Sequence, residues 1–121
     1  MRIFKNTWFA RFADKEGITD NELREMANQL EAGQADADLG GGVYKMRVAR
    51  ASEGKSGGYR VIVYFRSEER TFFVYGFAKS RRGNIDEKEL RLFKHDAKDQ
   101  LAMIDERLDA MLRKKDLIEI F

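Results

Sequence analysis

The sequence predicts an α+β domain, an antiparallel sheet packed against two N-terminal helices and a C-terminal helical region. Apolar residues recur at helical spacing near both ends of the chain, whereas from residue 43 they alternate with polar residues at the period of a strand. The resulting element order, β-α-α-β-β-β-α-(α)-β, is typical of the α+β class. With 121 residues, 43% of them hydrophobic, residues 1–121 can bury the core of a single domain.

The N-terminal third predicts one short strand and two helices. Residues 1–5 form the strand, and Asn6 or Thr7 caps a helix that ends near Gly17. Thr19 or Asp20 caps the second helix, which ends at Gly33. Its core-facing positions recur at i, i+3, i+4 and i+7: Leu23, Met26, Ala27 and Leu30.

The middle of the chain predicts an antiparallel meander. Polar residues 34–38 lead to a glycine run, and strands follow at residues 43–50, 59–66 and 70–78, with the second strand in the centre. Alternation places Lys45 and Arg47 on one face of the first strand, so one side of the sheet can pack on helices while the other stays partly cationic.

The C-terminal third predicts helix and a final strand. Asp86 caps a long amphipathic pattern, and Asp105 can restart it, so a continuous helix and a broken one both fit. Residues 117–121 can add a strand at the sheet edge.

The net charge of +2 hides an internal asymmetry. Residues 43–82 contain ten Lys or Arg and three acidic residues, a net +7, while the rest of the chain carries −5. Because aromatic residues are interleaved with these cations, the pattern favours a nucleic-acid site over mere protection of strand edges.

Composition excludes several other classes. There is no Cys, so neither a disulfide framework nor a thiolate metal site can form. No 18-residue apolar run and no leader-like N-terminus occur, so we expect a cytoplasmic protein without membrane contact. We expect no metal and no cofactor. The only histidine, His95, fits a solvated helix position, so any catalysis must come from Lys, Arg and Tyr.

Two stretches are candidates for RNA contact. The loop with Lys55 and Ser56 is no nucleotide-triphosphate site, because Ala49 replaces a required glycine and a strand follows. It can still cradle a phosphate, although an ordinary hairpin loop fits equally well. In the second stretch, Tyr75 can stack on a base, and further cations follow it: Lys79, Arg81 and Arg82.

Three segments in the same order resemble the RelE/HigB-like toxins of type II toxin–antitoxin systems. They are Leu39–Arg50, then Gly54–Arg60, then Phe72–Lys79 with Asn84 and Ile85. The resemblance implies a small RelE-like fold, an antitoxin that is commonly a helix-turn-helix protein, and cleavage of mRNA on the translating ribosome. Cationic side chains can stabilise the transition state of that cleavage without a metal, so we expect a metal-independent endoribonuclease. The long C-terminal helical region departs from the smallest relatives.

The resemblance also implies residue roles. Lys45, Arg47 and Arg50 would lie on the RNA-facing strand, and Lys55 would bind phosphate. Arg60 would stabilise the scissile phosphate, with Tyr75 and Lys79 flanking the reacting nucleotide. Two other functions fit the sequence: a gyrase-directed toxin of the ParE-like branch, and a non-catalytic RNA-binding module.

Overall fold

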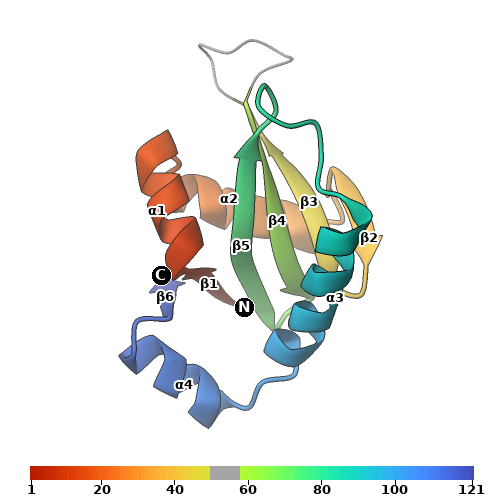
Figure 1. Cartoon of the computed structure of the whole chain (residues 1–121). Coiled ribbons are helices and arrows are strands. Elements are labelled where there is room, and N and C mark those ends of the chain that lie inside the picture. The colour runs from red at the N-terminus through yellow and green to blue at the C-terminus, as the bar shows by residue number, and fades with distance from the viewer. Residues whose placement is uncertain (50–57) are drawn as a thin grey trace.

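A single sheet organises the computed structural model, which describes residues 1–49 and 58–121. Within these residues six strands lie in the order β2-β3-β4-β5-β1-β6, and helices cover both faces of the sheet (Figure 1). The elements in chain order are β1 (Arg2–Asn6), α1 (Thr7–Glu16), α2 (Asp20–Glu31), β2 (Ala37–Gly40), β3 (Val43–Val48), β4 (Tyr59–Arg66), β5 (Arg70–Ala78), α3 (Glu87–Leu101), α4 (Asp105–Arg113) and β6 (Leu117–Ile120).

Helices α1, α2 and α3 begin at side-chain caps that the sequence predicts, whereas α4 begins after Ile104 without one. The Asn6 side chain accepts a hydrogen bond from the Phe9 N–H at 2.7 Å, which satisfies a free donor of the first turn of α1. Thr19 with Glu22, and Asp86 with Glu89, form reciprocal capping boxes at the starts of α2 and α3.

The meander of β3, β4 and β5 is antiparallel with β4 in the centre, as predicted. β1 then adds to β5 in parallel, and β6 closes that edge by pairing antiparallel with β1. The sheet is therefore mostly antiparallel, in agreement with the α+β class.

Helices pack on both sides of this sheet. Tyr59, Val61 and Val63 of β4 lie in a core with α1 and α2, whereas Ile62 and Tyr64 lie in a second core with α3 and α4. The prediction of one helix-covered face and one cationic face is therefore wrong for much of the second face. Cations remain at both ends of this face: Arg47 and Arg60 where β4 begins, and Arg66 and Arg70 where it ends, the latter two donating to carbonyls at the end of α3 and just after it.

The strand β2 was not predicted, and the C-terminal region decides between the two predicted helix arrangements. The short strand β2 begins at Ala37, inside a stretch expected to be irregular, because a polar, Gly-rich edge strand lacks an apolar period. The C-terminal pattern is broken into α3 and α4 between Leu101 and Asp105. No helix among the described residues combines the length and hydrophobicity needed to span a membrane.

Candidate nucleic-acid interface

The candidate site begins where β1 leaves the sheet. β1 pairs with β5 only as far as Phe73, because the chain turns into α1 at Thr7. Beyond this point α1 lies beside the last residues of β5 in place of a strand (Figure 1). The Asn6 side-chain amide donates to the Val74 carbonyl at 3.1 Å and thereby fixes the turn.

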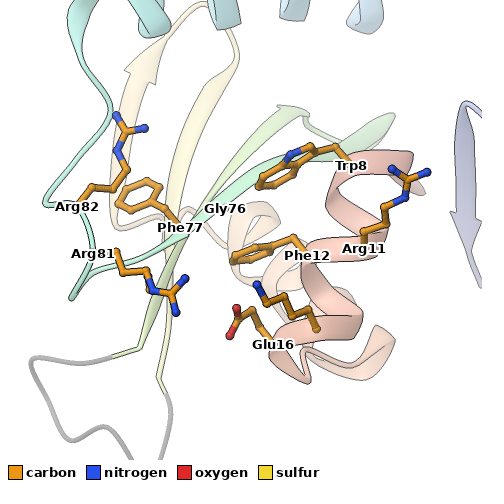
Figure 2. A pocket seen from close by; sticks show the side chains of 10 residues that line it. Trp8, Arg11, Phe12, Glu16, Gly76, Phe77, Arg81 and Arg82 are labelled. Carbon is orange, nitrogen blue, oxygen red and sulfur yellow. The ribbon is translucent and has the colours of Figure 1, made fainter.

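A groove of about 480 Å³ lies between α1 and the end of β5. We call it the α1–β5 groove. Its walls carry rings from both elements, and cations from α1 and from the residues that follow β5 (Figure 2). The residues that line it are Trp8, Arg11, Phe12, Lys15, Glu16, Gly76, Phe77, Ala78, Arg81 and Arg82.

Gly76 allows the close approach of α1 to the strand. A Cβ built on Gly76 would lie 2.4 Å from the Phe12 ring, which is far inside van der Waals contact. The absence of a side chain at this position therefore gives Phe12 its place against β5.

Aromatic rings continue from the groove along the sheet. The Trp8 ring stacks on Phe12 with centroids 5.5 Å apart, and on Tyr75 with centroids 4.7 Å apart. Tyr75 also contacts Phe93 of α3 at 5.7 Å, so neighbouring aromatic rings flank it from α1 and from α3. Because the Tyr75 ring is covered in this way, its hydroxyl is the part of the side chain that forms hydrogen bonds.

Arg82 contacts a residue of the groove and a residue on the α3 face of the sheet. Its guanidinium lies 5.5 Å from the Phe77 ring centroid and donates to the Tyr75 hydroxyl at 3.2 Å. It also donates through both terminal nitrogens to Glu89, in the bidentate geometry of Arg–carboxylate pairs. These hydrogen bonds lower the pKa of Glu89 and raise that of Arg82. Arg82 is thus an anchored cation whose charge Glu89 largely balances.

The registers of β3, β4 and β5 align several predicted residues. Arg47 lies opposite Arg60, which lies opposite Phe77. Two residue pairs along, Lys45 lies opposite Ile62, which lies opposite Tyr75. Directly paired residues point to the same face of a sheet. Lys45, Arg47, Arg60 and Tyr75 therefore share the face on which α3 packs, and we call these four residues the sheet-face row.

Exposure differs within the sheet-face row. Arg47 is exposed, whereas Arg60 is 7% exposed and its Nε lies 3.8 Å from an Asp36 carboxylate oxygen. Arg60 can act on a bound anion from beneath the surface, with the exposed Arg47 beside it on β3. Burial of a cation costs free energy unless a partner compensates it, which is the role that Asp36 fills.

Two more of the cations predicted to bind RNA, Lys79 and Arg81, lie just after β5. Lys79 and Arg81 are exposed, and the Lys79 ammonium donates to the Gly83 carbonyl at 3.1 Å. Arg50, Lys55 and Ser56 were also predicted to bind RNA, and they lie outside the described residues.

Sequence reasoning missed the contribution of α1. Trp8, Arg11, Phe12 and Lys15 follow a spacing of i, i+3, i+4 and i+7, which places them on one face of the helix. Aromatic residues and cations alternate along this face, and that alternation was the available signal. None of these four side chains is fully buried, since in α1 only Phe9 and Ala13 are.

Neither a metal centre nor a histidine site forms in the part of the chain that the structure describes. It contains no group of three or more His, Asp or Glu side chains placed to hold a metal ion. His95 is exposed on α3, as expected for a solvated helix position.

A comparison with protein families agrees with this architecture. The family model described as "RelE toxin of RelE / RelB toxin-antitoxin system" matches residues 1–120.

Proposed function

Because the chain belongs to the RelE toxin family of toxin–antitoxin systems, we propose that it is an endonuclease that cleaves mRNA on the translating ribosome. Toxins of this family are generally ribonucleases that pair with an antitoxin. The observation that carries the proposal is the sheet-face row, since its register gathers three cations and a tyrosine on one face of the sheet.

RNA supplies its own nucleophile for this reaction. The 2′-oxygen attacks the adjacent phosphorus and loses its proton, the bond from phosphorus to the 5′-oxygen breaks, and that oxygen gains a proton. The products are a 2′,3′-cyclic phosphate and a 5′-hydroxyl. Cationic side chains can stabilise the extra negative charge of the pentacoordinate intermediate, so we propose that the protein itself binds no metal for this step.

The positions suggest separate roles. Arg60, held by Asp36, stabilises the scissile phosphate from below, and Arg47 with Lys45 binds the flanking backbone. Tyr75, whose hydroxyl receives a hydrogen bond from Arg82, and the exposed Lys79 flank the reacting nucleotide. In this proposal Arg50, Lys55, Ser56 and Arg81 contact neighbouring phosphates.

The test is primer extension on mRNA in purified translating ribosomes, with and without the protein. We expect new 5′ ends with the wild-type protein, and at least about 100-fold slower cleavage with Arg60→Gln. Arg113→Ala on α4 removes an exposed cation outside the site and should cleave at the wild-type rate. Intact mRNA at saturating wild-type protein would refute the proposal.

Two further measurements, one in cells and one on purified RNA, distinguish the two other functions. DNA damage in cells with intact transcripts would indicate a gyrase-directed toxin. RNA binding that weakens steeply with salt, without new 5′ ends, would indicate a non-catalytic module.

Arg60 needs a second variant because it is buried. Arg60→Lys keeps the charge and loses the planar fork, so it should retain the thermal transition but lose most of the activity. If Arg60→Lys is folded and fully active, the role proposed for Arg60 is wrong.

We propose further that the chain is of the HigB-like branch and that its partner is a helix-turn-helix antitoxin. The motif resemblance supports this assignment. Co-purification with the product of the adjacent reading frame tests it, and an antitoxin of another fold would contradict it.

A further inference from the structure

The α1–β5 groove exposes a ring surface that the proposed cleavage chemistry does not use. Trp8 is 46% exposed, although a tryptophan is among the side chains that gain most from burial. Its ring plane lies within 12° of that of Phe12, so the two rings form a continuous wall along the α1 side of the groove. We propose that the groove binds an unpaired nucleobase of the RNA, adjacent to the nucleotide that is cleaved.

The charges around the groove match a polyanion. Arg11, Lys15 and Arg81 are exposed at the rim, and none of them forms an ion pair with another described residue. Glu16 lines the groove but accepts the hydrogen bond of the Tyr59 hydroxyl. The groove lining thus keeps an excess of positive charge beside its aromatic rings, the combination by which proteins bind single-stranded nucleic acid.

The groove adjoins the sheet-face row at the end of β5, although α1 and the row lie on different faces of the sheet. Phe77 lines the groove and lies opposite Arg60 in the β4–β5 register, while Arg82 contacts both Phe77 and Tyr75. An RNA strand with its phosphate at Arg60 can therefore place a neighbouring base in the groove. The volume of about 480 Å³ lies in the range of pockets that hold ligands of nucleotide size. This relation to the cleaved nucleotide rests on the proposed function.

Trp8 is the only tryptophan of the chain, so its fluorescence reports directly on the groove. The probe is a short single-stranded 2′-O-methyl oligouridylate, which lacks the free 2′-hydroxyl and cannot be cleaved. We expect saturable quenching of Trp8 by this probe. Inorganic polyphosphate of equal charge should bind without the same quenching, because it has no base.

Binding of the same labelled oligonucleotide, followed by anisotropy, tests the individual residues. Trp8→Ala should weaken binding about tenfold, a loss typical of one stacked base. Arg11→Ala and Lys15→Ala should each reduce the slope of log affinity against log salt by about 0.7. Arg113→Ala should match the wild type in both respects. Thermal melting of each variant verifies that α1 is folded.

The outcomes separate the groove from the catalytic proposal. Quenching without any cleavage of ribosomal mRNA supports the groove and refutes the endonuclease. Cleavage with no change at Trp8 and unaltered binding by Trp8→Ala refutes the groove alone. Quenching by an acidic peptide but not by the oligonucleotide would also overturn the proposal, since it would assign the groove to a protein partner.

Discussion

At the scale of single residues, Gly76 connects the fold to the candidate site. A glycine inside a strand ordinarily weakens it, yet here the missing side chain makes room for a ring from another element. Phe12 is consequently partly buried: one part of it packs against the core of α1 and α2, and it also lines the groove.

We expect Gly76→Ala to destabilise the protein by about 1–3 kcal/mol, because the new methyl group must displace the Phe12 ring. Urea unfolding measures this change. Gly83→Ala is the matched control: a Cβ there meets no atom within 4 Å, so its stability should change little. Equal effects of the two substitutions would show that crowding at Phe12 is not the cause.

Leu23 of α2 tests the core in which α1 and α2 pack. Its side chain is fully buried, so Leu23→Ala should lower the free energy of unfolding by about 2–5 kcal/mol. The exposed Leu92 of α3 provides the comparison, since Leu92→Ala removes the same atoms from a solvated position. A small loss at Leu23 would contradict the assigned packing.

At the scale of elements, helix α3 positions the cation that joins the two parts of the site. Glu89 lies in its first turn, accepts from the Asp86 N–H within the capping box, and binds Arg82. The Glu89 carboxylate thus both caps the first turn of α3 and holds the Arg82 guanidinium in place.

This arrangement predicts a pH dependence. The hydrogen bonds from Arg82 and from the Asp86 backbone hold the pKa of Glu89 below its ordinary value of 4.5. A lowered native pKa stabilises the fold at pH values above the unfolded pKa, and this stabilisation is lost as the pH falls through the native pKa. We therefore expect Glu89→Gln to be less stable than the wild type near neutral pH, with the difference shrinking below about pH 4.5.

Urea midpoints of both proteins from about pH 7 to pH 3 measure this effect. Glu106→Gln, at an exposed position of α4, is the control and should follow the wild type throughout. A Glu89→Gln difference that is constant over the whole range would show that the pair with Arg82 contributes nothing through charge.

The sequence predicts most elements because their signals are local. Capping residues such as Thr19 and the alternation of residues 59–66 need no knowledge of the rest of the chain. The strand β2 was missed because pairing with β3, rather than any pattern of its own, makes it a strand. The groove was missed for a related reason: it exists only where α1 meets β5, and no short window contains both.

At the scale of the whole molecule, the C-terminal strand completes the sheet around β1. Leu117 and Ile120 of β6 are buried in different cores, and Glu119 pairs with Arg2 at 2.9 Å. The long region after β5 therefore forms part of the framework that holds β1, and with it the start of α1.

Deletion of residues 117–121 should abolish the cooperative thermal transition or lower it substantially, because β1 loses a partner strand and both cores lose a buried side chain. Circular dichroism melting measures this change. Phe121→Ala removes only a side chain that is 92% exposed and should shift stability by no more than about 0.5 kcal/mol. A deletion variant that melts like the wild type would place β6 outside the folding unit.

The point at which β1 ends has a consequence for related chains. The chain turns at Asn6, and the opening beside β5 exists only because the backbone turns there. Two more paired residues in β1 would extend the ladder over this opening and lift the helix away from it. The position of the first helix cap relative to the β1–β5 ladder is therefore the feature to compare when asking whether a related toxin has such an opening.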